Sequence, residues 1–207
     1  MIKTVLDPAA METLRLYKLV TGTVVPRPIG FISTMGENGV ANVAPFSFFN
    51  AVGDSPPVVA FAPQGRKPDR PIKDTLANVQ ATGEFVCNLA TYALREQMNL
   101  TSASLPAGVD EMRAAGLTPA PARLVKPPRV AESPAQLECR LLQILDLPTW
   151  DPAERQALVI GLVVGIHIDD ALIKDGRIDI VSVQPIARLG YALYATVDRS
   201  FRMPRPD

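Results

Sequence analysis

The chain has 207 residues, of which 47% are hydrophobic and 20% charged, and its 21 basic residues balance its 21 acidic ones. A neutral chain of this length predicts one domain with one sizeable core, and its charge gives no reason to expect a nucleic acid as partner. Residues 1–18 lack the apolar core of a signal peptide, and no later run is long enough to cross a bilayer. The sequence therefore predicts a soluble cytoplasmic protein that makes no use of a membrane.

The two cysteines, Cys87 and Cys139, lie in separate apolar segments, and His167 is the only histidine. No metal-type spacing joins these residues, so we expect buried thiols and no metal site. Twenty prolines gather at segment ends, a distribution that helix interiors reject and that favours short strands and ordered loops.

The first half of the chain predicts a hairpin, two further strands and a short helix. Residues 27–35 and 40–46 are strand-like and flank the turn 36–39, whose Gly and Asn supply positive φ angles. Residues 58–62 and 85–89 predict two more strands. Between them Asp74 is expected to be the N-cap of a helix over 75–81 that Gly83 ends.

The second half predicts an insertion followed by longer strands. Residues 92–100 and 108–115 have helical composition and the proline-rich 117–130 predicts loop, so 101–130 reads as an insertion able to cover a site. Strict alternation from Ala135 predicts a half-exposed strand, with apolar Ala135, Leu137, Cys139 and Leu141 on one face and polar Gln136, Glu138 and Arg140 on the other. The apolar run 157–168 predicts a strand buried on both faces, and 181–189 and 191–197 predict two more strands.

Short strands separated by turn signals predict a mainly β fold, a closed or nearly closed antiparallel barrel with short helices in its insertions. The sequence contains no Gly-x-Gly-x-x-Gly of the kind that a nucleotide-binding βαβ unit carries.

The segment 66–75, RKPDRPIKDT, places four basic residues and one acid before a predicted helix start. Unpaired N–H groups and the helix dipole at such a start favour an anion of phosphate size. The alternative is a solvated charged loop with an ordinary capping aspartate.

In the strand 157–168, period 2 puts Gly161, Val163, Gly165 and His167 on one side, so that two positions without side chains lie next to the single imidazole and leave room for a flat ring. Alternatively, the glycines relieve crowding inside a small barrel and His167 is a hydrogen-bonded structural residue.

In the segment 42–50, NVAPFSFFN, Pro45 removes a ladder donor and predicts an irregular strand. Backbone groups at 44–48 would then be open to the polar edge of a ring, with Asn42, Ser47 and Asn50 as side-chain partners. The alternative is a bulged strand whose aromatic residues fill the core.

Hydrolytic chemistry is poorly supported because there is no Gly-x-Ser-x-Gly and only one histidine. What remains is a planar, largely apolar, phosphorylated ligand that supplies its own chemistry while the protein orients it.

Six segments in order resemble the flavin reductase-like family with the FMN-binding split barrel: VVPRPIGFIST, NGVANVAPFSFFN, SPPVVAFA, KDTLANVQATGEFVCNL, GLVVGIHIDD and ARLGYALYATVDRSFRMPRP. The resemblance implies a single split-barrel domain over 1–207, with a core over about 17–200 and a C-terminal tail from 198. It also implies a homodimer with one FMN per subunit near the interface. NADH or NADPH would reduce the FMN, and a flavin, a ferric complex, oxygen or a partner monooxygenase would accept the electrons. Two alternatives are an FMN-binding electron carrier without its own NAD(P)H reaction and a barrel that has lost its cofactor.

By position in that family, the resemblance implies three groups of cofactor contacts. These are Asn42, Ala44, Pro45, Phe46, Ser47, Phe48 and Asn50 at the ring edge and ribityl chain; Arg66, Lys67, Lys73, Asp74 and Thr75 at the phosphate; and His167, Arg188 and Phe201. His167 is the expected catalytic residue, as a hydrogen-bond donor that adjusts the flavin ring or the nicotinamide. Tyr191 stands where many relatives have the second glycine of RLGG.

Overall fold

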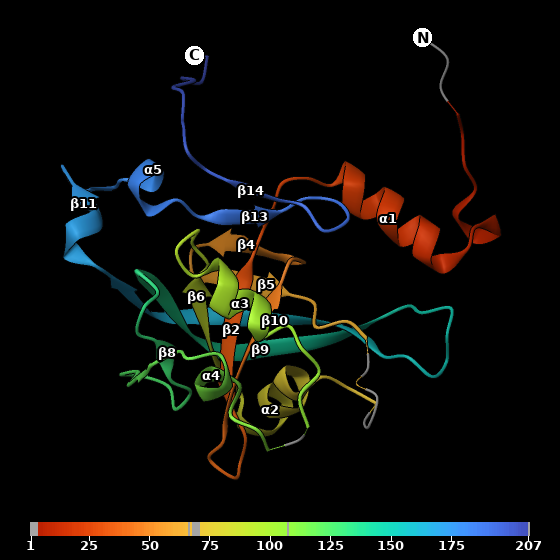
Figure 1. The fold of residues 1–207 in the computed structure, drawn as a ribbon, viewed down its shortest axis with the longest axis horizontal. Helices are drawn as coiled ribbons and strands as arrows, with labels where there is room; N and C mark the ends of the chain where they lie inside the picture. The colour runs from red at the N-terminus through yellow and green to blue at the C-terminus, as the bar shows by residue number, and fades with distance from the viewer. Residues whose placement is uncertain (1–3, 66, 68–70, 107, 207) are drawn as a thin grey trace.

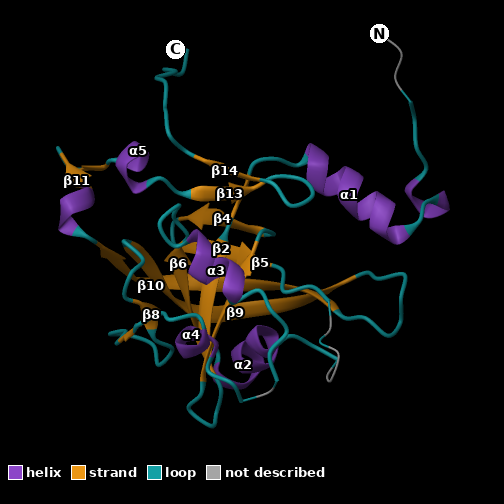
Figure 2. Cartoon of the chain, in the orientation of Figure 1, coloured by secondary structure: helices purple, strands orange, loops and turns teal. Residues whose placement is uncertain are grey.

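The computed structural model describes residues 4–65, 67, 71–106 and 108–206, and its centre is one antiparallel sheet of seven strands (Figures 1 and 2). In spatial order the strands are β3 (Ala41–Phe46), β2 (Gly30–Met35), β6 (Glu84–Leu89), β9 (Ala135–Leu147), β10 (Gln156–Ile168), β5 (Pro57–Phe61) and β4 (Phe49–Asp54). The two edge strands, β3 and β4, are consecutive in the chain and are joined by Ser47 and Phe48 alone. The sheet thus curls toward closure without β3 pairing with β4, and the expected mainly β split barrel is confirmed.

The predicted hairpin is confirmed as β2 and β3. The Gly39 amide donates to the Gly36 carbonyl at 2.9 Å, with Gly39 at φ 77°, the left-handed conformation that favours glycine. The expected irregularity at Pro45 is wrong, because pairing is unbroken from Gly30 opposite Phe46 to Met35 opposite Ala41. Pro45 is tolerated since β3 is an edge strand, where a missing N–H costs no ladder bond.

An apolar core fills the concave side of the sheet. The Phe61 ring lies 5.3 Å from both the Phe46 and Phe85 rings, and Val159 packs with them. Cys87 and Cys139 belong to this core as free, buried cysteines, as expected, and burial raises the pKa of the Cys87 thiol.

Strands β9 and β10 form the longest pairing in the molecule, and a bulge divides β10. The register runs from Val163 opposite Cys139 directly to Gly165 opposite Glu138, so Val164 is an extra residue. An extra residue reverses which face the following side chains occupy. The prediction that Gly161, Val163, Gly165 and His167 share one side is therefore wrong.

Burial along these two strands also differs from expectation. In β10 only Ala157, Val159 and Gly161 are buried, so the strand is not covered on both faces throughout. In β9 the polar Gln136 and Glu138 are buried instead of exposed. Burial along β9 and β10 depends on segments that are distant in the chain, so the alternation of residues within each strand could not predict it.

The described helices are short. They are α1 (Thr13–Thr23), α2 (Asp74–Thr82), α3 (Arg95–Leu100), α4 (Glu111–Ala114) and α5 (Ile180–Val183), with 3-10 turns at Pro8–Ala10 and Asp170–Leu172. Among the residues that the structure describes, no helix has the length and apolar character needed to span a membrane. Gly83 ends α2 with φ 69°, as predicted, but the N-cap is Lys73 and Asp74 is the first helical residue.

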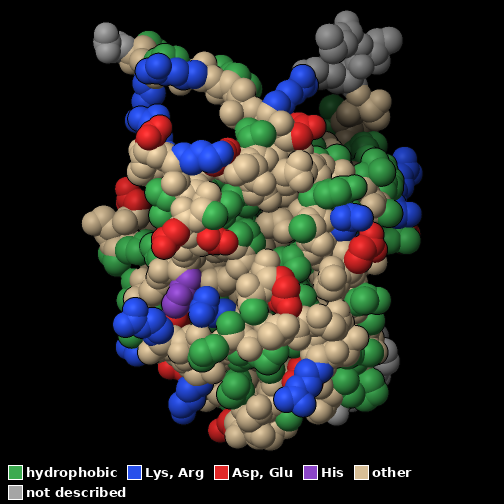
Figure 3. Space-filling view, turned by 60° about the vertical axis from the view of Figure 1, so that its left-hand side comes forward, with side chains coloured by type: hydrophobic (Ala, Val, Ile, Leu, Met, Phe, Trp, Pro, Cys, Tyr) green, Lys and Arg blue, Asp and Glu red, His purple; other side chains and the backbone are tan. Residues whose placement is uncertain are grey.

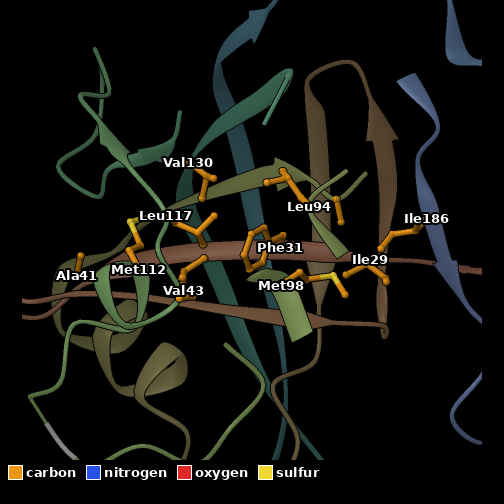
Figure 4. Close-up of a cluster of buried hydrophobic side chains, with 12 residues drawn as sticks. Ile29, Phe31, Ala41, Val43, Leu94, Met98, Met112, Leu117, Val130 and Ile186 are labelled. Atoms are coloured by element: carbon orange, nitrogen blue, oxygen red, sulfur yellow. The ribbon is translucent and has the colours of Figure 1, made fainter. Parts of the chain in front are cut away.

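The insertion after β6 covers the outer face of β2 and β3. It contributes α3, α4 and the paired strands β7 (Pro119–Ala120) and β8 (Arg129–Val130), so the predicted helices are confirmed and part of the predicted loop is a small sheet. Figure 4 shows Met98, Met112 and Val130 converging on Phe31. Burying each such side chain stabilises the fold by roughly 1.5–3 kcal/mol.

A second sheet of three strands lies at the opposite end from α2: β1 (Arg27–Pro28), β13 (Ile186–Arg188) and β14 (Tyr194–Thr196), beside α1 (Figure 1). Buried Arg27 donates to the carbonyls of Val24 at 2.6 Å and Leu189 at 3.0 Å, which ties α1 to this sheet. The predicted strand 181–189 is α5 followed by β13, and the predicted strand 191–197 is a turn followed by β14. Strands β11 (Ile173–Lys174) and β12 (Arg177–Ile178) form a separate hairpin.

Candidate functional site

A cavity of about 730 Å³ lies between the barrel and the three-stranded sheet. Its walls come from α1, the end of β3, α3, β13 and β14, so segments from both ends of the chain meet there. This volume is in the range of pockets that bind cofactors and other small molecules.

Three of the predicted cofactor residues line this cavity: Pro45, Ser47 and Arg188. Pro45 lies on edge strand β3, and Ser47 follows directly on it, so the wall includes backbone groups of a sheet edge. Arg188 donates to the Tyr194 hydroxyl and, at 2.6 Å, to the Tyr191 carbonyl, and its guanidinium carbon lies 4.5 Å from the Tyr194 ring centre. The cavity therefore joins a polar strand edge to a cationic, aromatic wall.

Arg95 gives the cavity a second cation, which like Arg188 lies over a tyrosine ring. Its guanidinium carbon lies 4.1 Å from the Tyr92 ring centre, and Nη1 donates to the Tyr92 carbonyl at 2.8 Å. Arg95, Tyr92 and Tyr17 are not predictable from the sequence as cavity residues, because helical composition at 92–100 gives no sign of a cavity wall and no pattern at 13–23 predicts a helix.

The other residues of the segment 42–50 diverge from the cavity. Phe46 points into the barrel core against Phe61, and Phe48 lies with its ring centre 6.0 Å from the Arg27 guanidinium carbon. Ala44 is half-buried, and exposed Asn50 uses Oδ1 to accept the Ala51 amide at 2.9 Å. Period 2 along the strands explains this division, since alternate side chains must take opposite faces.

The predicted phosphate residues form a buried polar cluster around Lys67. This side chain is only 6% exposed, and its ammonium contacts the carboxylate of Asp74 and, at 3.3 Å, that of Glu111. The Thr75 hydroxyl donates to Asn42 Oδ1 at 3.0 Å, and Asn42 Nδ2 donates to Glu111 Oε2 at 2.7 Å. The sequence-predicted Asn42, Lys67, Asp74 and Thr75 are thus brought together, apart from the residues that line the cavity.

Glu111 is the member of this cluster that sequence reasoning missed. It lies on α4 of the insertion and is 4% exposed. Burial raises the pKa of the Glu111 carboxyl, and the neighbouring Lys67 ammonium opposes that rise. In the sequence Glu111 is one acidic residue within the predicted helix 108–115, and no local pattern indicated that this helix would return to Lys67.

Of the basic residues Lys73 and Arg66, the structure describes only Lys73. Lys73 is the half-buried N-cap of α2, and no hydrogen bond of its side chain is found in the described part of the chain. It stands where helix N–H groups and a cationic side chain come together, a combination that favours an anion. Arg66 lies outside the described residues.

His167, Arg188 and Phe201 do not meet in this chain. His167 is hydrogen-bonded to Glu138 and lines two smaller cavities, of about 460 and 400 Å³, neither of which includes Pro45, Ser47 or Arg188. Figure 3 shows this histidine at the surface between Lys and Arg side chains. Phe201 is 83% exposed in the C-terminal tail.

The turn after β13 holds a non-glycine residue in an unfavourable backbone conformation. Tyr191, which takes the place of a glycine in the RLGG form, has φ 61°, in the left-handed region. Gly190 lies close to α1, since a Cβ there would come within 3.0 Å of Gly22 Cα.

These residues fit a planar phosphorylated cofactor in part. The 730 Å³ cavity offers volume, the Ser47 hydroxyl, edge backbone groups and the Arg188 guanidinium. Lys73 with the α2 N-terminus suits a phosphate but does not line this cavity. Lys67 is less suited as a phosphate ligand in this conformation because two carboxylates already neutralise it.

The chain is similar to known proteins over most of its length. The family described as "Flavin reductase like domain" matches residues 21–182. An uncharacterized protein of Halalkalibacterium halodurans is 36% identical over 201 residues, which are 97% of this chain and 96% of that protein.

Two solved structures are similar over nearly their whole length. Nitrilotriacetate monooxygenase component B from Bacillus cereus has a TM-score of 0.92 and 32% identity, covering 98% of this chain and 100% of that one. The 2-nitrobenzoate 2-nitroreductase of Pseudomonas fluorescens has a TM-score of 0.86 and 28% identity, covering 98% and 96%. From its matched sequence and its split-barrel fold, the chain belongs to the flavin reductase-like family.

Proposed function

We propose that this protein is a cytoplasmic, FMN-binding oxidoreductase that accepts hydride from NADH or NADPH and passes electrons to a second acceptor. The acceptor classes are a free flavin, a ferric complex, oxygen and a partner monooxygenase. The observation that carries the proposal is the 730 Å³ cavity, which joins the predicted cofactor residues Pro45, Ser47 and Arg188 in a chain of this family.

Each group in the proposal has a defined task. The Ser47 hydroxyl and the backbone of edge strand β3 hydrogen-bond the polar edge of the flavin ring, and Arg188 offers positive charge to it. Lys73 and the N-terminal amides of α2, which lie outside this cavity, are the groups that the family resemblance assigns to the phosphate, with the Asn42–Thr75 cluster supporting that helix start. FMN, when bound, supplies the hydride-accepting chemistry, while the protein positions the reactants and excludes water.

The proposal includes a homodimer. On the exposed side of α1 lie Leu14, Tyr17 and Val20, and Leu193 after β13 is 62% exposed. Apolar side chains gathered on one projecting helix and the adjoining turn are suited to burial against a second copy. The partner oxygenase is proposed on the likeness to a structure named as a monooxygenase component B.

The test is an absorbance titration of the purified protein with FMN, followed by anaerobic mixing with NADH and, separately, NADPH. We expect FMN to bind and one nicotinamide to bleach its absorbance rapidly. The variant Ser47→Ala is compared with the unmodified protein. It removes one hydroxyl from the cavity wall and should weaken FMN binding by about tenfold, the equivalent of one hydrogen bond. Binding of FMN without bleaching would indicate the electron carrier instead, and failure to bind FMN would contradict both.

A further inference from the structure

The single histidine is held by a buried carboxylate from the neighbouring strand. His167 on β10 is hydrogen-bonded through Nε2 to Glu138 Oε1 on β9. The Glu138 side chain is completely buried, whereas 21% of the His167 side chain remains exposed. One imidazole nitrogen is therefore committed to the protein interior.

Glu138 is ionised by its surroundings. Its oxygens accept the backbone amides of Arg123 at 2.8 Å, Leu124 at 2.6 Å and Val125 at 3.1 Å, in addition to His167. Burial alone would raise the pKa of Glu138, but these amide bonds and His167 outweigh it and the pKa is lowered. A carboxylate that accepts at both oxygens has no proton to give, so the hydrogen in the pair must belong to His167.

We infer that Glu138 is a positioning residue that fixes His167 with its proton on Nε2 and leaves Nδ1 as the nitrogen available to a ligand. No hydrogen bond to Nδ1 is found within the described ranges of the chain. A neutral imidazole in this form accepts through Nδ1, so it suits a ligand N–H or hydroxyl, such as a primary carboxamide. His167 donates to a ligand only as imidazolium, which refines the donor role expected of it.

The surroundings of His167 contain both signs of charge. Arg129, Glu132 and Asp169 line one of its cavities, and Arg123 lines the other. Arg129 is occupied by the Pro121 carbonyl at 3.1 Å and Gln136 at 3.0 Å. Glu138 is the group among these that contacts the ring, so it sets the position of the proton.

Glu84 provides a matched control. It lies on β6, and its Oε2 accepts the Lys126 amide at 2.9 Å, so it holds the same loop without contacting a histidine. A change seen in Glu138→Gln and absent from Glu84→Gln is therefore due to the imidazole contact and not to loosening of the loop.

The test is nitrogen-15 NMR of His167 in the whole protein at a pH where imidazole is neutral. Because the chain has one histidine, its ring signals need no assignment. We expect the Nε2–H form in the unmodified protein and in Glu84→Gln. In Glu138→Gln the amide oxygen should stay with the Leu124 and Val125 donors and give up the single bond from Arg123, which turns the NH2 group toward His167 and moves the imidazole proton to Nδ1.

A folded Glu138→Gln protein that keeps the proton on Nε2 would overturn the inference. If that variant does not fold, the unmodified protein decides: we expect a ring proton on Nε2 protected from exchange with water, and a rapidly exchanging one overturns the inference.

The consequence for turnover rests on the proposed reductase function, whereas the NMR result does not. With FMN bound, Glu138→Gln should raise the KM for NADH or NADPH by about tenfold with little change in kcat, and should add nothing in a His167→Ala background. Absence of any NAD(P)H reaction in the unmodified protein contradicts the proposed function alone. Additive effects of the two substitutions contradict the coupling of Glu138 to His167.

Discussion

Lys67 Nζ lies 3.3 Å from Glu111 Oε1, and this contact joins the segment before α2 to the insertion helix α4. The two residues are 44 positions apart, and both are almost completely buried. The insertion thus does more than cover apolar strands, because it supplies a counter-charge to a cation that the sequence alone assigns to a ligand.

Replacing Lys67 should destabilise the fold. In Lys67→Met the Glu111 carboxylate stays buried without its cation, and losing one partner of a buried ion pair costs about 3 kcal/mol or more. The free energy of unfolding in urea measures this loss. Lys73→Met is the control: it should change stability by less than about 0.5 kcal/mol, yet weaken FMN binding. Equal stabilities for the two variants would contradict the ion-pair role of Lys67.

Glu111 should make stability depend on pH with a definite sign. Burial raises its pKa, so the folded state holds the proton more tightly than the unfolded state. Stability then falls as pH rises from the ordinary value of 4.5 toward the raised folded-state pKa, with a slope of at most about 1.4 kcal/mol per pH unit from this group.

The side chain of the Glu111→Gln variant cannot titrate, so the stability of that variant should fall less steeply over that range. Urea unfolding at several pH values measures the slope, with Glu96→Gln, an exposed carboxylate, as the control. Equal slopes in the unmodified protein and Glu111→Gln would contradict the prediction.

Local chemistry made part of this fold predictable. The hairpin turn and the end of α2 depend on glycines at positive φ, and the barrel class follows from short apolar strands between turns. The Val164 bulge depends on pairing with β9, and burial of Gln136 and Glu138 depends on the return of the insertion. No local pattern contains that information.

The candidate site divides in the same way. Pro45, Ser47 and Arg188 line one cavity, although they come from opposite ends of the chain. The basic residues around Lys67 could not predict its ion pair with Glu111, because Glu111 lies on helix α4 of the insertion, far from Lys67 in the sequence. The remaining contacts at His167 and Phe201 stay predictions.

Gly161 is required by the packing of the barrel core. A Cβ at this position would lie 2.3 Å from Phe85 Cζ, so Gly161→Ala should destabilise the protein by about 1–3 kcal/mol. Gly165→Ala is the matched variant, because its nearest neighbour is the flexible end of Leu124 at 3.2 Å, and it should cost much less. Denaturant unfolding of both variants measures the difference. A Gly161→Ala protein as stable as Gly165→Ala would show that crowding is not the reason for this glycine.

Tyr191 should be replaceable by glycine with a gain in stability. A left-handed conformation costs an ordinary residue roughly 1–2 kcal/mol, part of which glycine returns through its larger unfolded-state entropy. Tyr191→Gly should therefore stabilise the fold by about 0.5–1 kcal/mol, since the bond from Arg188 goes to the backbone carbonyl and is kept. Tyr191→Ala retains the strain and should show no gain. A rise in thermal midpoint for both variants would point to the exposed ring instead of the backbone.

His167→Ala separates a role in the reaction from a role in the fold. Glu138 keeps its three backbone donors in this variant, so the insertion loop stays attached and stability should change by less than about 1 kcal/mol. If His167 contacts the flavin or the nicotinamide in the assembled protein, the loss of its hydrogen bond should lower kcat/KM for the reduced nicotinamide, or FMN affinity, by about tenfold. Steady-state kinetics with NADH and NADPH and an FMN titration measure both quantities.

His167→Gln, which retains a side-chain donor and acceptor, should recover part of the loss, because the hydrogen bond and not the ring is what the reaction requires. Unchanged kinetics and FMN affinity in His167→Ala would confine this histidine to its contact with Glu138.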